Sequence, residues 1–236
     1  MESLISGSNP SVRSELDLFN IMSTDVSVIS SDFQQYYPLT SVKENENPLE
    51  FFVPGDNTHY LDLHSSYLYL KAKIVNQDGS NLAATSLCAP GQLFFGSMFQ
   101  NCSVSLNGTC VFDSSNFYPY HAWIQRQLSC GESEKKSELT SEIYYKDSAP
   151  DDYTLTGNPG FKSRYALSTE SAAFEIIGKP YATIFQQKRY IPNNVNMSIA
   201  FRRSSPKFSL SSATTTISGK LLSFILTLNL NYEINK

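Results

Sequence analysis

The stretch LLSFILTLNLNY (residues 221–232) decides the fold class, because its side chains alternate in polarity at nearly every second position. One expected face of this strand is apolar and consists of Leu222, Phe224, Leu226, Leu228, Leu230 and Tyr232. The opposite face is formed by Ser223, Ile225, Thr227, Asn229 and Asn231. Neighbouring side chains of a β-strand point to opposite sides, so this period of two predicts a strand that covers a hydrophobic core.

The same period recurs in YLYLKAKIV (residues 67–75), whose apolar positions are Leu68, Leu70, Ala72 and Ile74. Shorter strands are expected at residues 48–54, 173–177, 181–185 and 195–201, separated by turns rich in Gly, Pro and Asn. Hydrophobic residues make up 41% of the 236-residue chain and aromatic residues 13%, which supplies a substantial core. We therefore expect an all-β fold, a β-sandwich or jelly roll of about eight strands.

A hairpin is expected in CSVSLNGTCVF (residues 102–112), because Asn-Gly is the preferred pair for a two-residue type I′ turn. This register pairs Leu106 with Thr109 and Ser105 with Cys110, and it places Cys102 and Cys110 on opposite faces. The hairpin therefore forbids a disulfide between these two cysteines. We expect free thiols at all four positions, Cys88, Cys102, Cys110 and Cys130.

Composition and hydropathy bear on disorder, on membrane insertion and on the domain organisation. Charged residues are only 17% of the chain and the net charge is −4, which argues against disorder and against a general polyanion binder. The longest apolar run is far shorter than the ~20 residues of a membrane span, and the first residues lack a signal-peptide pattern. We expect an extended N-terminal arm over residues 1–47 and a single jelly-roll domain over residues 48–236.

A helix-bearing insertion is expected at residues 117–147 within this domain. Pro119 falls where a first helical turn tolerates proline. Apolar side chains follow at helical spacing, namely Tyr120, Trp123, Ile124 and Leu128. We expect this stripe to be the packing face of a helix over residues 116–129, and we interpret the charged residues 132–138 as an exposed linker. The apolar residues at 94–99 are expected in the core.

Catalytic chemistry has little support. His59, Asp62 and His64 could in principle bind a divalent metal, but His59 and His64 differ by five positions and point to opposite faces of a strand. The acidic residues Asp147, Asp151 and Asp152 are expected in a solvated loop. No nucleophile elbow or phosphate-binding glycine loop is present. We therefore expect no enzyme, and no catalytic, cofactor-binding or metal-binding residue.

Positive charge is concentrated in one part of the chain. Residues 161–220 hold nine basic and two acidic residues, a net +7, which leaves −11 for the remainder. Such asymmetry is typical of a nucleic-acid-facing surface, and the candidates are Lys188, Arg189, Arg202, Arg203 and Lys207. Two other interpretations stay open: basic residues protect exposed strand edges, and they pair with acidic surfaces at subunit contacts.

The order of the sequence motifs resembles the hexon-like major capsid proteins of Polinton/Maverick elements and adintoviruses, in their N-terminal half. The motifs are SELDLF (14–19), PLEFFVPG (48–55), YLDLHSSYLYLKAKIVNQDGSNL (60–82), LFFGSMFQNCSVSLNGTCV (93–111), YPYHAWIQ (118–125), KKSELTSEIYYKD (135–147) and IFQQKRYIPNNVNMSIAFRRS (184–204). The resemblance implies a viral jelly roll, with two barrels side by side in each family protein and three chains in a pseudo-hexagonal capsomer.

The resemblance also implies a structural role in the virion, assembled inside the host cell. The expected partners are other copies of the chain, as a trimer rather than a pentamer, other capsid proteins and packaged DNA, with no membrane. Interface anchors are expected among Tyr36, Tyr37, Tyr67, Tyr69, Tyr144 and Tyr145, since tyrosine is enriched at interfaces. The alternatives are a single-barrel, penton-like vertex protein and a jelly-roll binding module, either a lectin or a receptor-binding domain.

Overall fold

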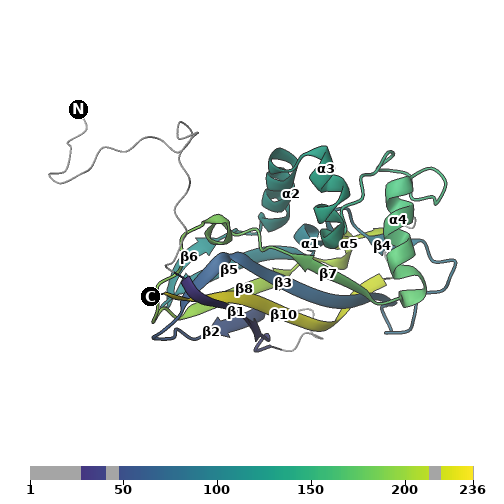
Figure 1. Cartoon of the computed structure of the whole chain (residues 1–236). Helices are drawn as coiled ribbons and strands as arrows, with labels where there is room; N and C mark the ends of the chain where they lie inside the picture. Colours follow the sequence, from purple (N-terminus) through teal and green to yellow (C-terminus); the bar gives the residue numbers. More distant parts are fainter. Residues whose placement is uncertain (1–27, 41–47, 213–218, 236) are drawn as a thin grey trace, which may run out of the picture.

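Two four-stranded antiparallel sheets pack against each other in the computed structural model, which describes residues 28–40, 48–212 and 219–235 (Figure 1). The first sheet has the order β1 (Val28–Tyr36), β10 (Gly219–Asn235), β3 (Tyr60–Asn76), β7 (Phe174–Gly178). The second has the order β2 (Leu49–Val53), β8 (Met197–Arg203), β5 (Phe99–Leu106), β6 (Thr109–Asp113). A separate short pair joins β4 (Cys88–Pro90) to β9 (Leu210–Ser212).

The strand order is that of a jelly roll. Without the short strands β4 and β9, eight strands remain, and the chain crosses from one sheet to the other at every connection except the β5–β6 hairpin. The last strand, β10, inserts between the first and the third, and β8 inserts between β2 and β5. Eight strands in two interleaved Greek keys define the viral type of jelly roll. The predicted fold class is confirmed.

The first strand of the jelly roll lies inside the segment that we expected to be an arm. Val28–Tyr36 forms β1 and pairs antiparallel with β10, with Phe33 opposite Asn231 and Tyr36 opposite Leu228. The expectation of an arm is therefore wrong for this stretch. This stretch has a low apolar content because β1 is an edge strand and most of its side chains are exposed. Residues 1–27 and 41–47 lie outside the described part of the chain.

The long strands fill the core as their alternation predicts. In β3 the side chains of Leu68, Leu70, Ala72 and Ile74 are buried. They face the second sheet, where Phe201 of β8 contacts the rings of Phe51 and Phe99. The expected positions 222–225 of β10 lie outside the described side chains, but Leu226, Leu228, Leu230 and Tyr232 are all buried.

The polar face of β10 is also buried, which the alternation did not predict. Thr227, Asn229 and Asn231 are each less than one tenth exposed. The cause is the central position of β10, because side chains of the two flanking strands cover it from either side. The Ser31 hydroxyl of β1 donates a 2.7 Å hydrogen bond to the side-chain oxygen of Asn231. The Ser66 hydroxyl of β3 accepts a hydrogen bond from the backbone N–H of Asn231. Asn231 is thus hydrogen-bonded within the sheet, whereas Glu233 Oε2, buried on the same strand, has no hydrogen-bond partner among the described residues.

The hairpin at Asn107-Gly108 has the predicted register beside its turn, and a β-bulge shifts the register between Ser105 and Val104. Ser105 pairs with Cys110 and Leu106 with Thr109, and both turn residues have positive φ angles of 48° and 80°. A type I′ turn requires this conformation, which glycine adopts without strain. Cys102 is buried and Cys110 is exposed, so the two thiols face opposite ways. All four cysteines are free, as expected.

The helical segments gather on one side of the sheets (Figure 1). They are α1 (Phe94–Ser97), α2 (Tyr118–Ser129), α3 (Glu132–Lys136), η2 (Glu138–Glu142), α4 (Pro159–Ser168), η3 (Thr169–Ser171), η4 (Thr183–Gln186) and α5 (Pro206–Ser209). The strand expected at 181–185 is wrong, since this stretch forms the 3-10 turn η4. The expected linker 132–138 is exposed but largely helical.

Helix α2 exists as predicted but presents the opposite face to the core. Tyr118 and Ala122 are buried, whereas the predicted packing stripe, Tyr120, Trp123, Ile124 and Leu128, is exposed. Gly96 explains the close approach of α1 and α2, because a Cβ atom at this position would lie 2.9 Å from the Ala122 Cβ. The small residues therefore select which side of the helix faces inward.

Replacing Leu228 by alanine should lower the free energy of unfolding by about 2–5 kcal/mol, because the change leaves a cavity at a fully buried position. Urea unfolding followed by circular dichroism measures the difference. Leu39→Ala is the matched control, since Leu39 is 71% exposed and its truncation should change stability by less than about 0.5 kcal/mol. Equal losses in both variants would contradict the assigned core.

Candidate functional site

The residues of the possible metal cluster do not converge. His59 contacts Asp56 and the Thr58 hydroxyl in the loop before β3, and the His59 ring lowers the pKa of the Asp56 carboxyl. His64 Nδ1 instead lies 2.6 Å from Lys179 Nζ, and Asp62 accepts the His64 backbone N–H at 2.9 Å. Within residues 28–40, 48–212 and 219–235, no three His, Cys, Asp or Glu residues come together as a set of metal ligands.

A buried polar network joins the helical insertion to the jelly roll. Arg126 of α2 lies 2.5 Å from the Glu142 carboxylate of η2 and donates through Nε to the Tyr181 hydroxyl at 2.8 Å. Tyr181 in turn donates to Glu142, and its backbone N–H donates to the Tyr118 hydroxyl at 3.0 Å. Sequence analysis missed this network, because its members come from distant parts of the chain.

Burial dominates the electrostatics of this network. It raises the pKa of the Glu142 carboxyl, although Arg126 beside it acts in the opposite direction. Burial also raises the pKa of Tyr181, and the charge of Glu142 raises it further. Glu142 and Tyr181 are 3% and 1% exposed, so a substrate has no access to them. The geometry therefore fixes the position of α2 and η2 rather than supporting catalysis.

Arg164 is a second buried cation that the sequence did not reveal. Its guanidinium donates to Pro90 O at 2.9 Å and to Tyr145 O at 2.7 Å, and it lies 3.0 Å from the Asp147 carboxylate. Asp147 is therefore partly buried and paired, which corrects the expectation of a solvated loop at this residue. Helix α4, which carries Arg164, begins at an Asn-Pro pair whose asparagine caps the helix. That cap was the available sequence signal.

The five basic candidates are divided between the two ends of β8. Lys188 and Arg189 are exposed and precede the bridge between Ile191 and Leu61, at the end where β8 begins. The others lie at or beyond the other end of the strand: Arg202, Arg203 and Lys207. A seven-residue strand separates the two ends by about 20 Å.

Burial also distinguishes the members of this basic set. Arg202 and Lys207 are exposed, whereas Arg203 is 9% exposed, and burial lowers its pKa. Lys162 and Arg164 of the same basic stretch lie on α4, where Arg164 is engaged in the buried contacts described above. The local charge of +7 is therefore not presented on one surface.

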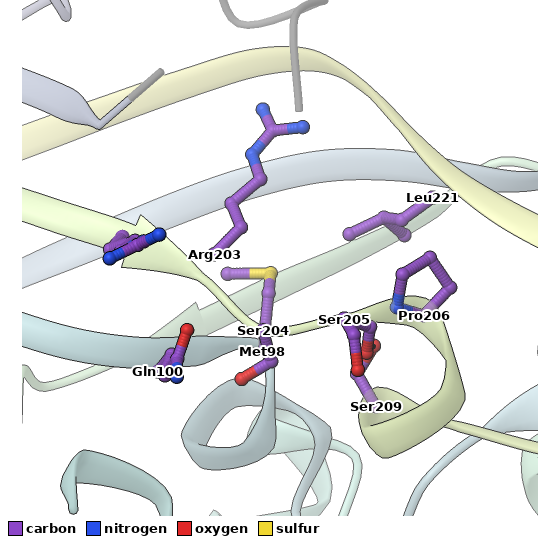
Figure 2. A pocket seen from close by; sticks show the side chains of 9 residues that line it. Met98, Gln100, Arg203, Ser204, Ser205, Pro206, Ser209 and Leu221 are labelled. Atoms are coloured by element: carbon purple, nitrogen blue, oxygen red, sulfur yellow. Dashed lines mark hydrogen bonds between the residues drawn. The ribbon is translucent and has the colours of Figure 1, made fainter. Parts of the chain in front are cut away.

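A cavity of about 460 Å³ lies beside the end of β8 (Figure 2). Figure 2 shows Met98 and Gln100 on one side and the turn into α5 on the other, with the Arg203 side chain pointing away from Ser205 and Pro206. Three serines line it, namely Ser204, Ser205 and Ser209, and the described residues of its lining include no histidine, cysteine or carboxylate. Such a lining can hold polar groups, but it offers no base to activate a serine.

The expected tyrosine anchors do not form the exposed apolar surface. Tyr144 is buried, and Tyr36 is partly buried with its hydroxyl 2.8 Å from that of Tyr232. Tyr67, Tyr69 and Tyr145 are also partly buried, which leaves Tyr37 as the exposed member of the six. Of the fifteen large apolar side chains that are exposed in the described part of the chain, six lie on or next to α2 and at Phe208 of α5. In the described segments, no helix is long and apolar enough to cross a membrane.

Comparison with known proteins gives one curated relative and several solved structures. No protein-family model matches the chain. An uncharacterized protein of Caenorhabditis elegans is 24% identical over 168 residues, which covers 68% of this chain and 38% of the relative. The chain therefore spans less than half the length of this curated protein.

Three of the solved structures that match come from viruses. A chain of the Sputnik virophage, determined by cryo-EM, aligns over 100% of this chain and 54% of its own length, with a TM-score of 0.55 and 13% identity. The mavirus major capsid protein aligns over 98% of this chain and 52% of its own length, with a TM-score of 0.48 and 13% identity. The Faustovirus major capsid protein covers 95% of this chain and 57% of itself, with a TM-score of 0.47 and 8% identity. The likeness to the Sputnik chain shows a common fold.

Replacing Arg126 by methionine should destabilise the protein by about 3–5 kcal/mol, because the change leaves Glu142 buried without its cation. Lys71→Met is the matched control. It removes the partner of Glu175 in an exposed ion pair at 2.8 Å, and such pairs contribute about 0–1 kcal/mol. Urea unfolding measures the loss in the free energy of unfolding for both variants. Equal effects would mean that the buried network does not hold the insertion in place.

Proposed function

We propose that this chain is a structural capsid protein of the hexon-like type found in Polinton/Maverick elements and adintoviruses. The observation that carries the proposal is the jelly-roll topology, which spans the described chain. The whole of this chain aligns with about half of a chain of the Sputnik virophage. The ordered series of sequence motifs supports the same family. In this proposal the chain self-assembles into capsomers of an icosahedral, virus-like shell, within a virion assembled inside the host cell.

The chemistry of the surface also favours a structural role. The cavity beside the end of β8 has no base beside its serines among the described residues, and the buried Glu142 and Arg164 are engaged in contacts between elements. Assembly instead needs large, well-packed contacts between subunits. The partners in this proposal are other copies of the chain, as a trimer rather than a pentamer, and other capsid proteins. This chain covers about half of the length of each solved structure that it matches. Capsomer assembly by a protein longer than this chain is therefore part of the proposal.

The native mass in solution tests this function. Light scattering across a concentration series should give a trimer or a larger assembly, and negative-stain images of the same sample should show its symmetry. Five-fold rings would instead support the penton-like alternative. A monomer at every concentration would contradict self-assembly of this chain and would support the binding-module alternative, which glycan and protein-partner screens would then examine.

We also propose that part of the basic surface faces packaged DNA. The exposed members of the candidate set can reach a phosphate: Lys188, Arg189, Arg202 and Lys207. Arg203 is omitted because its side chain is buried. The four residues form two separate pairs at opposite ends of β8, so one end of the jelly roll can face the DNA while the other does not.

Duplex DNA should bind at about 50 mM salt and lose affinity steeply as salt rises, because binding releases counterions. The double variant at the DNA-facing end, either Lys188→Gln with Arg189→Gln or Arg202→Gln with Lys207→Gln, should reduce the salt slope by about two. The other double variant serves as its control. No measurable binding at low salt would remove the DNA proposal and leave the structural one intact.

A further inference from the structure

Helix α2 has an apolar stripe on each of two opposite sides. Tyr118 and Ala122 point inward together with the aliphatic part of Arg126, whereas Tyr120, Ile124 and Leu128 point outward at the same spacing of four. Positions 118 and 120 lie about 200° apart around a helix. An apolar stripe of a helix is normally buried against another element. In the single chain, only one side of α2 is covered.

The inner side is held firmly, so the outward stripe is a fixed surface. The Tyr118 ring packs against the rings of Phe99, Tyr181 and Phe201 at centroid distances of 6.0–6.3 Å. Arg126 adds the buried contacts with Glu142 and Tyr181 described above. The helix therefore has no freedom to rotate its outer stripe into the core, and the exposure follows from the packing of the inner side.

The exposed side chains form one continuous surface, which we call the α2 patch. It consists of Phe117, Tyr120, Trp123, Ile124, Leu128 and Phe208, between 37% and 83% exposed. The Tyr120 ring contacts those of Phe117 and Phe208 at 6.4 and 6.0 Å. Hollows of about 240 and 340 Å³ lie beside this ring contact, and Trp123 lines the larger one. These hollows can accept side chains from a partner.

The size of the α2 patch points to a protein partner. At roughly 200 Å² of accessible surface for each large side chain, the exposed fractions amount to roughly 700 Å². A soluble monomer rarely exposes more than about 300–600 Å² in one apolar patch. One side of a stable protein–protein interface covers ~800 Å². The patch therefore has the area that one subunit contributes to a stable contact.

The charge of the patch favours an uncharged surface on the partner. Arg126 is the one charged residue of α2, and it is engaged with Glu142 on the inner side. No formal charge lies among the six residues of the patch, so an apolar surface of another copy can cover it without burying an unpaired charge. We propose that the α2 patch is the surface through which a second copy of this chain docks. The inference rests on the proposed self-assembly and names the surface that it uses.

Trp123 allows a direct test, because it is the single tryptophan of the chain and belongs to the patch. Light scattering and tryptophan fluorescence are measured on the same concentration series of the full chain. As the mass rises, the Trp123 emission should shift to the blue and acrylamide quenching should fall towards the value of a buried indole. Both changes should share one midpoint concentration.

Leu128→Asp is the matching variant, and Leu167→Asp is its control. Leu128 and Leu167 are the penultimate residues of α2 and α4, both are exposed, and only Leu128 belongs to the patch. Aspartate near a helix C-terminus is equally unfavourable to both helices. Leu128→Asp should weaken self-association at least tenfold, because it places an unpaired charge in an apolar contact, while Leu167→Asp associates like the unchanged chain.

The outcomes separate this inference from the proposed function. Association with unchanged Trp123 quenching, or with equal effects of the two variants, would overturn the α2 patch and leave self-assembly standing through another surface. A chain that remains monomeric at all concentrations would overturn both. Circular dichroism of each variant ensures that a loss of association is read only from folded protein.

Discussion

The insertion of β10 between β1 and β3 is the constraint on which the rest of the structure depends. This strand of 17 residues pairs with β3 along most of its length and with β1 over residues 228–235, and it places Leu226, Leu228 and Leu230 in the core. Because β1 and β3 come early in the chain and β10 comes last, this sheet requires the two ends of the described chain to meet. Contacts of such high sequence separation are costly to form, since the intervening chain must be ordered before they stabilise it.

The helical insertion is attached to this frame by buried charge rather than by apolar packing alone. Glu142 and Tyr181 are removed from water and Arg126 is partly buried, and the desolvation of such groups offsets much of their attraction. The second cation, Arg164, ties α4 to Pro90 and to the segment before α4 in the same manner. Buried ionic networks of this kind add little net stability, but their hydrogen bonds and ion pairs form in only one arrangement of the elements that carry them. Their effect here is to set the orientation of α2 and of the surface that it carries.

Orientation matters because α2 is apolar on both sides. The contact between the small residues Gly96 and Ala122 brings α2 close to α1. It leaves Tyr120, Ile124 and Leu128 in solvent. In a protein that acts alone, such a surface favours non-specific association. In a subunit of a larger particle, it is the part of the core that is completed only by a neighbour. The jelly roll thus supplies the rigid frame, and the insertion supplies the apolar contact surface.

Local patterns in the sequence determined the long strands and the hairpin. The alternation around Leu68 and Leu228 and the Asn107-Gly108 turn depend on neighbours within a few residues, and they indicated an all-β jelly roll correctly. Tertiary structure alone decided three other features: the pairing of the polar stretch 28–36 as β1, the burial of Asn229 and Asn231, and the side of α2 that faces inward. Each depends on a partner far away in the chain, which a periodicity cannot specify. The amphipathic stripe of α2 was visible in the sequence, but only the packing of Tyr118 and Ala122 determined that this stripe faces outward.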